Sequence, residues 1–367
     1  MQSEPSTKQE MIFSSLQSRI VRGEWGFGAQ IPTEDELAAE FHCSRGTVGR
    51  AVARLVQEGL VERKTRMGTR VIRNSIIPHN TATIDLDACA FIYPADQHEG
   101  VWRTGRGFER AAYAAERRTL MLSTGSDFRK EAEIVGRLAE FDVKGAVLFP
   151  VTLDPSQMIY YAQMIHSCPF PVVLVELNIA GLGRPSVVVD GLHAGYTMTR
   201  HLLRQGAKRI GFFANYAWTS SIRDRYLGYR QALEDAGLPE NREWVMMEPT
   251  MTPNFEDPFE ETIALGSRYL EKSGDLEGVV CSSDYCALGV IRSAQARGIS
   301  VPESLKVTGV DDFAIAASSK IPLTTYHVRY EDIGIKAFET LNTLMRGEPL
   351  DFLEIQVRGE LVARQSA

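Results

Sequence analysis

The start of the chain shows helical spacing of apolar residues in successive short stretches. In the first stretch these residues recur every four positions: Ile12, Leu16 and Ile20. This spacing predicts an amphipathic helix that ends at Gly23. The second stretch begins with Thr33 and Glu36, which have the Thr-x-x-Glu spacing of a capping box. We therefore expect two helices within the first 41 residues.

The third stretch begins after Ser44, a second candidate N-cap, and ends at Gly59. Its apolar residues share one helical face: Val48, Val52, Leu55 and Val56. Residues 60–63 and 69–72 then flank a basic turn that contains Gly68, which predicts a β-hairpin. Two short helices joined by three or four residues form a helix-turn-helix, whose second helix places side chains on base edges, and the hairpin would be its wing.

This segment resembles the winged helix-turn-helix of the GntR family. The resemblance covers residues 10–73 and consists of three runs in order, IPTEDELAAEF, SRGTVGRAVARLVQEGLV and MGTRV. It implies binding to double-stranded DNA, with Arg45 as the main base-reading side chain because Arg can donate two bonds to guanine. The expected DNA contacts are Thr33, Ser44, Arg45, Thr47, Arg50, Lys64, Arg66 and Gly68. Gly49 stands where the family usually has Arg, which bears on the operator sequence.

The charge of the chain is divided unevenly. Residues 1–75 contain eleven Lys and Arg against nine Asp and Glu, a net +2, so the remainder of the −7 chain has a net −9. A basic head on an acidic body indicates a nucleic-acid contact confined to the head. We expect a DNA-binding domain over 1–73, an extended linker over 74–87 and an effector-binding and dimerisation domain over 88–367.

Beyond the linker, short apolar runs alternate with amphipathic stretches, several of which end in Gly. This alternation predicts an α/β fold with doubly wound parallel sheets covered by helices on both faces. The predicted strands are Cys89–Tyr93, Leu120–Ser123, Ala146–Phe149, Val172–Val175, Ser186–Val189, Ile210–Phe213, Val245–Met247, Gly278–Cys281 and Lys306–Val310. Nine strands indicate two lobes of four to five strands each.

The two lobes are assigned along the chain as follows. The first lobe is expected to contain roughly residues 88–190 and a segment near 316–325. The second lobe is expected to contain roughly residues 191–315 and the C-terminal part.

Ligands of parallel sheets bind beyond the carboxyl ends of the strands. Carboxylates, hydroxyls, an arginine and aromatic rings follow several predicted strands there. This set suits a hydroxylated ligand, because charged groups form paired hydrogen bonds with hydroxyls and an aromatic face covers the apolar face of a sugar. The candidate ligand-binding residues are Arg225, Asp311, Ser283, Glu176, Ser221, Phe149 and Trp218.

This region resembles the effector domain of the LacI/GalR family, which has the fold of type I periplasmic binding proteins. The resemblance spans residues 88 to about 362 and includes the runs RYLGYRQAL, SSDYCALGV and GISVPESLKVTGVDDF. It implies that Arg225 and Asp311 bind ligand hydroxyls. Ser283 stands where the family usually has Asn, which points away from common hexoses. Asp284 is expected to cap the helix that follows it, and Asp190 is expected to be structural.

Composition narrows the class of protein further. Hydrophobic residues make up 44% and charged residues 24%, which is ordinary for a globular chain. We expect no transmembrane helix, since no apolar run approaches 18 residues, and no secretory signal. Five cysteines without a CxxC pair indicate neither a disulfide framework nor a zinc site. We therefore expect a cytoplasmic protein with no metal and no cofactor.

Taken together, the two resemblances predict a ligand-responsive transcription regulator, most simply a repressor, with the architecture of the arabinose-responsive AraR type. A homodimer is expected on a palindromic operator, with a sugar or sugar derivative bound between the lobes. The alternatives are a regulator of a non-sugar ligand and an enzyme fused to a DNA-binding head. Catalysis is disfavoured because the chain has no G-x-S-x-G elbow and no phosphate loop that ends in Gly-Lys-Ser/Thr.

Overall fold

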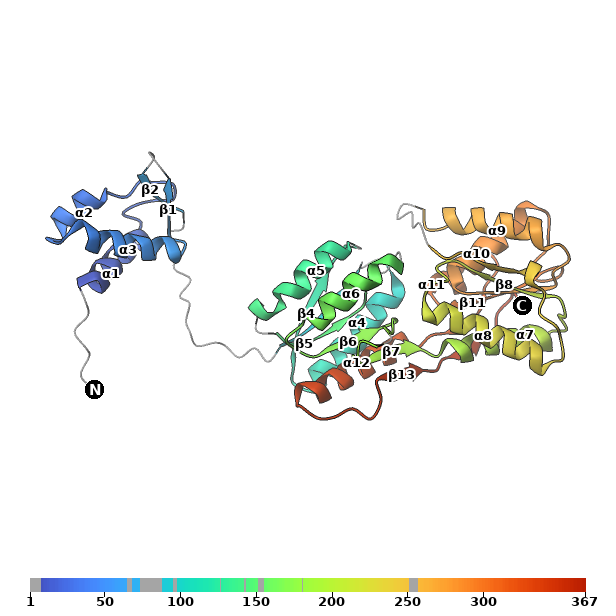
Figure 1. Cartoon of the computed structure of the whole chain (residues 1–367). Helices are drawn as coiled ribbons and strands as arrows, with labels where there is room; N and C mark the ends of the chain where they lie inside the picture. The colour runs from blue at the N-terminus through green and yellow to red at the C-terminus, as the bar shows by residue number, and fades with distance from the viewer. Residues whose placement is uncertain are drawn as a thin grey trace. The chain divides into compact units, whose positions relative to one another are not determined.

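A computed structural model shows the fold (Figure 1). The structure describes residues 8–64, 68–72, 88–94, 98–125, 127–141, 143–150, 155–179, 181–250 and 257–367. The chain divides into two compact units, Met1–Ile84 and Asp85–Ala367, here called the head and the body. Within the described ranges, no helix has the length and apolar character needed to span a membrane.

The head contains three helices and a hairpin. The helices are α1 (Lys8–Val21), α2 (Glu34–Glu40) and α3 (Arg45–Gln57). Strands β1 (Val61–Lys64) and β2 (Gly68–Val71) pair antiparallel. The apolar stripe predicted for α1 is buried against α3, and these side chains form the core of the head. The predicted helices and hairpin are therefore confirmed.

The first lobe of the body, lobe 1, is built on a six-stranded sheet in which every pair is parallel, in the order β13-β7-β6-β5-β3-β4. Its strands are β3 (Ala88–Tyr93), β4 (Arg118–Ser123), β5 (Val143–Leu148), β6 (Val172–Val175), β7 (Ser186–Val189) and β13 (Glu354–Val357). Its helices are α4 (Glu99–Ala114), α5 (Phe128–Arg137), α6 (Met158–His166) and α12 (Tyr330–Met345), with 3-10 turns at Leu138–Phe141 and Pro155–Gln157.

Alternate residues of the lobe 1 strands enter two separate cores. Phe91 packs on the face covered by α4 and α12, whereas Ile92 packs on the face covered by α5 and α6. Both side chains are fully buried, which explains why this strand is a continuous apolar run.

The second lobe, lobe 2, has a six-stranded sheet in the order β14-β12-β11-β10-β8-β9, with only β14 antiparallel to its neighbour. Its strands are β8 (Ile210–Ala214), β9 (Val245–Met247), β10 (Gly278–Cys281), β11 (Lys306–Asp311), β12 (Thr324–His327) and β14 (Glu360–Val362). Its helices are α7 (Gly191–Arg204), α8 (Ser220–Asp235), α9 (Glu260–Ser273), α10 (Asp284–Ala296) and α11 (Ala314–Ser318), with a 3-10 turn at Arg242–Trp244.

All nine predicted strands overlap an observed strand, and the predicted boundary between residues 190 and 191 is confirmed, but the predicted count per lobe and the assignment of the segments after residue 315 were wrong. Each sheet has six strands because β12, β13 and β14 were not predicted. The segment near 316–325 belongs to lobe 2, since β12 pairs with β11. Conversely, much of the C-terminal part belongs to lobe 1, because α12 packs on α4 and β13 pairs with β7.

The chain therefore passes between the lobes three times, after β7, β12 and β13. Two of these crossings are joined directly, because Arg358 Nε donates to Asp190 Oδ2 at 2.8 Å. The third crossing, after β12, is connected to the others by Tyr326, whose hydroxyl accepts from the Gly359 N–H at 2.7 Å. These contacts connect the three crossings in one region, which we call the hinge.

Candidate functional site

The N-terminus of α3 has the geometry expected of a recognition helix. The Ser44 side chain accepts from the Thr47 N–H at 3.3 Å, and the two hydroxyl oxygens lie 2.8 Å apart. The predicted cap is thus confirmed. Thr33 forms the predicted capping box with Glu36 at the start of α2. Both caps fix exposed hydroxyls at helix starts, where backbone N–H groups also face outward.

Arg45 extends from the first turn of α3 and is 67% exposed. Its Nε lies 3.3 Å from Glu34 Oε2, and its Nη1 lies 3.6 Å from Asp35 Oδ2. Arg63 of β1 also pairs with Glu34. Exposed pairs of this kind contribute only about 0.2–1 kcal/mol, so DNA phosphates or bases can replace them. Gly49 faces the same carboxylate, with a Cβ placed there lying 3.5 Å from the Glu34 oxygens.

Further basic side chains are exposed on the wing and on α3. Lys64 of β1 is exposed and lies 3.1 Å from Glu62. Arg50 of α3 is also exposed. Gly68 has a φ of +79°, a left-handed conformation that favours glycine, and a Cβ there would lie 2.2 Å from Gln30 Nε2, so the Gln30 side chain would have to move. Arg66, the remaining predicted DNA contact, lies outside the described residues.

In the body, the structure brings together three of the predicted ligand-binding residues. Glu176 directly follows β6 of lobe 1, whereas Arg225 lies on α8 and Asp311 ends β11 of lobe 2. Arg225 Nη2 lies 4.0 Å from Asp311 Oδ1, and both residues are 5% exposed. The charges of Arg225 and Asp311 both act on Glu176. We use the name cleft for this buried group of side chains, to which both lobes contribute.

Two close helix contacts place Arg225. A Cβ on Gly195 of α7 would lie 1.8 Å from the Arg225 carbonyl oxygen, and a Cβ on Gly228 of α8 would lie 2.0 Å from the Leu192 carbonyl oxygen. Glycine at both positions lets the two helix backbones touch. The Arg225 side chain then donates through Nη1 to the Ser282 carbonyl oxygen.

Strained backbone marks the two carboxylates of the cleft. Glu176 has a φ of +58° and Asp311 a φ of +126°, in a region that residues other than glycine rarely adopt. Such strain costs on the order of 1–3 kcal/mol per residue and is concentrated at binding sites. Glu176 and Asp311 therefore lie on backbone that is held at a cost.

The acidity of the cleft carboxyls is shifted. Burial raises the pKa of Glu176 to about 7, against the opposing effects of Arg225 and of a hydrogen bond from the Val189 N–H. Burial likewise raises the pKa of Asp311 to about 6, although Arg225 and the Tyr330 hydroxyl favour the ionised form. The pKa of Asp284 is also raised well above its ordinary value, first by burial and then by Asp311. Burial of these three carboxyls therefore favours their protonated forms more than isolated carboxyls would.

The predicted role of Asp284 needs correction. Ser283, whose contact with a ligand remains a prediction, is the N-cap of α10, and its hydroxyl accepts from the Cys286 N–H at 3.2 Å. Asp284, predicted to be that cap, is instead fully buried. Its carboxylate accepts from the Phe313 N–H at 2.9 Å and from the Thr325 hydroxyl at 2.5 Å. Because Ser283 already caps the helix, the Asp284 carboxylate is free to fix the segment that follows Asp311.

The remaining predicted ligand-binding residues of the body lie on α8 or directly next to strands and helices of the two lobes. Ser221 is in the first turn of α8, and Phe149 directly follows β5 and packs against the main core. Trp218 lies between β8 and α8, and its indole N–H is buried without a partner among the described residues. Their contact with a ligand remains a prediction. Asp190 caps α7 and pairs with Arg358, which confirms its structural role.

Tyr330 was missed by the sequence analysis. It begins α12, and its hydroxyl donates to Asp311 Oδ1 at 2.9 Å. Arg103 of α4 was also missed. Its guanidinium pairs with Glu331 and donates to the carbonyl oxygen of Val328 at 3.2 Å. Both residues depend on long-range packing of α4 and α12, for which the local sequence contains no signal.

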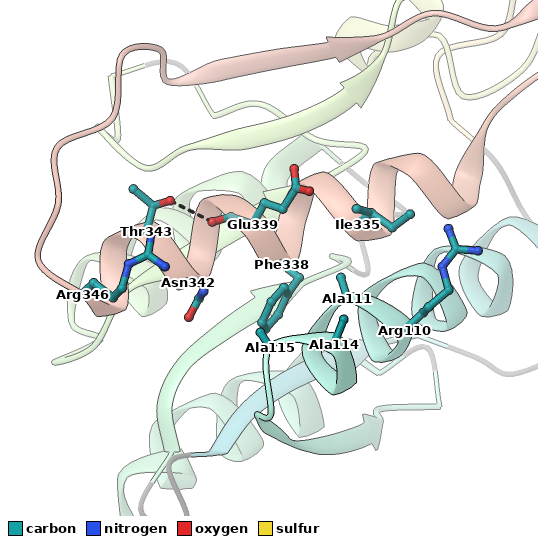
Figure 2. Close-up of a pocket in the computed structure, with 10 residues that line it drawn as sticks. All are labelled: Arg110, Ala111, Ala114, Ala115, Ile335, Phe338, Glu339, Asn342, Thr343 and Arg346. Carbon is teal, nitrogen blue, oxygen red and sulfur yellow. Dashed lines mark hydrogen bonds between the residues drawn. The ribbon is translucent and has the colours of Figure 1, made fainter.

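A groove of about 460 Å³ lies elsewhere on lobe 1, between α4 and α12. Figure 2 shows Phe338 and the small residues Ala111, Ala114 and Ala115 between the two helices, with Arg110 and Arg346 farther out. None of the predicted ligand-binding residues lines this groove. Within the described ranges, no group of three His, Cys, Asp or Glu side chains is arranged to hold a metal ion.

Comparison with known protein families divides the chain in the same way. Residues 8–71 match the bacterial regulatory proteins of the gntR family, and residues 199–367 match a periplasmic binding protein-like domain. The matched regions thus correspond to a GntR-type helix-turn-helix in the head and a periplasmic binding protein-like domain in the body, in agreement with the two sequence resemblances.

Individual relatives align with most of the chain. The arabinose metabolism transcriptional repressor of Geobacillus stearothermophilus is 25% identical over 98% of this chain and 96% of its own length. A solved structure of transcription regulator GntR from Chromobacterium violaceum is 26% identical, covers 76% of this chain and 98% of its own, and has a TM-score of 0.61. The transcriptional regulator CelR–cellobiose complex shares the fold, at 20% identity and a TM-score of 0.66 over 92% of this chain and 100% of its own.

Proposed function

We propose that this transcription regulator, which joins a GntR-type head to a periplasmic binding protein-like body, is a repressor controlled by a sugar bound between its lobes. The observation that carries the proposal is the meeting of Glu176 of lobe 1 with Arg225 and Asp311 of lobe 2. A molecule that binds all three contacts both lobes and favours one angle between them. The hinge crossings then couple that angle to the orientation of the heads on DNA.

The head supports operator binding through residues at the start of α3 and on the wing. In this proposal Arg45 reads a base, while Ser44, Thr47, Arg50, Lys64 and Arg66 contact phosphates or the minor groove. Thr33 and Gly68 set the positions of these contacts. A homodimer places two copies of α3 on the half-sites of a palindrome, one helical turn apart or a multiple of it.

The cleft supports a sugar as the effector. Buried carboxylates and an arginine form the paired, charge-assisted hydrogen bonds that hydroxyl groups require. A relative is named for arabinose metabolism, and CelR, which has the same fold, is known as a cellobiose complex. We propose the same class of effector here, in a cytoplasmic protein that is a regulator and not an enzyme.

A thermal-shift panel tests the effector assignment. The full chain is heated with monosaccharides, their phosphates, sugar acids and purines. A ligand that binds the native state at a hundredfold excess over Kd stabilises it by about 2.7 kcal/mol. We expect at least one sugar to raise the unfolding temperature.

Two variants place that sugar in the cleft. Asp311→Ala should abolish the shift, because it removes the carboxylate that both Arg225 and Tyr330 face. Asp351→Ala serves as the matched control, because Asp351 is exposed and lies outside the cleft. A sugar that stabilises Asp311→Ala as much as wild type contradicts the placement, and stabilisation by purines alone contradicts the sugar assignment.

A further inference from the structure

The wing has two faces with different surroundings. In the hairpin of β1 and β2, Val61 pairs with Val71 and Glu62 pairs with Arg70. Val61 and Val71 are buried in the core of the head. Because successive side chains of a strand alternate between the two faces of a sheet, Arg63 lies on the same face as Val61, whereas Glu62 and Arg70 lie on the other face. Arg63 is therefore on the side of the wing that faces the helices of the head.

Arg63 contacts the same carboxylate as Arg45, the main predicted base-reading residue. The Arg63 Nη2 donates to Glu34 Oε1 at the start of α2. The other oxygen of that carboxylate, Oε2, lies 3.3 Å from Arg45 Nε at the start of α3. The Arg63 and Arg45 side chains are 50% and 67% exposed. One carboxylate therefore holds a guanidinium of the wing next to a guanidinium of α3, and both remain accessible.

Neither guanidinium uses all of its donors. Within the described ranges, Arg63 has no hydrogen-bond partner besides Glu34, which leaves its Nε and Nη1 free. Arg45 also lies 3.6 Å from Asp35 Oδ2 through its Nη1, and its Nη2 has no partner among the same residues. Exposed ion pairs of this kind contribute little to stability, so acceptors on DNA can replace the carboxylates. Both arginines can therefore donate hydrogen bonds to DNA.

The surface of α3 is open beside this carboxylate. Gly49 lies one turn after Arg45 on the same face of the helix. A Cβ at Gly49 would lie 3.5 Å from both oxygens of Glu34, which is an ordinary contact, and it would meet no nearer atom. Packing within the described part of the head therefore does not require glycine there, although glycine disfavours a helix. Because position 49 has no side chain, it leaves the Glu34 carboxylate and the Arg63 guanidinium uncovered on this side.

We propose that Arg63 is a second operator-reading side chain, which the wing supplies beside Arg45 where α3 has only Gly49. This inference rests on the operator binding proposed for the head and adds a residue to it. Guanine presents two acceptors in the major groove, O6 and N7, which one guanidinium can bind with two N–H groups. Glu34 holds both arginines in place before DNA binds, so less side-chain entropy is lost on binding. Arg63 and Arg45 then read bases of the same groove.

A phosphate contact of Arg63 would have a different signature. Removal of a base-reading arginine changes the preference at one base pair. Removal of a phosphate-binding arginine weakens binding to all sequences about equally and lowers the salt dependence by about one phosphate contact. The position of Arg63 favours base reading, because Arg63 shares Glu34 with Arg45, whereas Lys64 pairs with Glu62 on the opposite face of the wing.

Operator selection followed by binding assays tests the inference. An operator is selected from random DNA with the full chain, and fluorescence polarisation then measures how wild type and Arg63→Ala bind it and its single-base variants. We expect Arg63→Ala to bind the selected operator about 5–150-fold more weakly and to lose its preference at one base pair. Arg70→Ala removes an arginine from the opposite face of the wing and should keep every base preference. Unchanged base preferences in Arg63→Ala overturn the inference, even where all of its affinities fall together.

A relocated arginine distinguishes loss of the guanidinium from damage to the wing. Gly49→Arg is added to Arg63→Ala, because a side chain at position 49 begins in ordinary contact with Glu34 and approaches it from α3. The double variant should regain most of the lost affinity and the preference at the same base pair. A double variant that binds no better than Arg63→Ala overturns the inference, because the loss then has a cause other than the missing guanidinium. A wild-type chain that selects no operator, with or without sugar, overturns the proposed function itself.

Discussion

The packing of α7 against α8 leads to a sharp prediction at Gly195. A Cβ at this position would lie 1.8 Å from the Arg225 carbonyl oxygen, whereas ordinary contact begins at 3.4 Å. Gly195→Ala therefore requires the two helices to separate by about 1.6 Å or the backbone to distort. Inserting one methyl group into a tightly packed contact costs typically about 1–3 kcal/mol.

This cost is large enough to measure by thermal unfolding. At about 2 °C per kcal/mol for a domain of this size, Gly195→Ala should lower the unfolding temperature by about 2–6 °C. The separation also displaces Arg225, so sugar affinity should fall together with stability.

Gly136→Ala provides the matched control. Gly136 lies within α5, and a Cβ there meets no atom within 4 Å. Because alanine favours helix over glycine by up to about 1 kcal/mol, this variant should be as stable as wild type or more so. Equal unfolding temperatures and equal sugar affinities for Gly195→Ala and wild type would refute the inferred backbone contact.

Three further predictions concern the head and the acidity of the cleft. Arg45→Ala should remove specific operator binding in a fluorescence polarisation assay and leave sugar affinity near that of wild type. Unchanged operator affinity would contradict the assignment of α3 as the recognition helix. Gly68→Ala should weaken operator binding at least several-fold without affecting sugar binding, because the left-handed backbone at Gly68 strains any residue with a Cβ and the Gln30 side chain would have to move; equal affinity would show that the wing tolerates a side chain there. Because the pKa of Glu176 is raised to about 7 and the ligand hydroxyls favour its ionised form, sugar affinity should rise between pH 6 and pH 8, by at most about tenfold per pH unit below that pKa. Glu176→Gln should flatten this profile, and a profile of the same slope in that variant would contradict the role of this carboxyl.

The elements of the head could be predicted because their signals are local. Thr33 with Glu36, and Ser44 with Thr47, are caps that form within one helical turn. The strands of the body were likewise detectable, because a strand buried on both faces is a continuous apolar run. The segments that follow the predicted strands then indicated Glu176, Arg225 and Asp311 as candidate ligand-binding residues, although their contacts with one another were not known.

The lobe assignment and several contacts could not be predicted, because they depend on long-range packing. After β12 in lobe 2, the chain crosses back to lobe 1, where it forms α12 and β13. No local sequence pattern predicts this crossing. The crossing brings Tyr330 to Asp311. The cap of α10 was misassigned by one residue, because serine and aspartate are both good caps and burial against Phe313 and Thr325 decided between them.

The most direct test of the account is the operator affinity of the full chain with and without sugar. An operator is selected from random DNA, and the sugar is the one that stabilises the protein most in the thermal-shift panel. The account predicts a change in affinity of about 5–150-fold on addition of the sugar, the range of ordinary allosteric coupling, and no change in Asp311→Ala. An operator affinity that stays the same in wild type at saturating sugar would contradict the claim that the cleft controls the head.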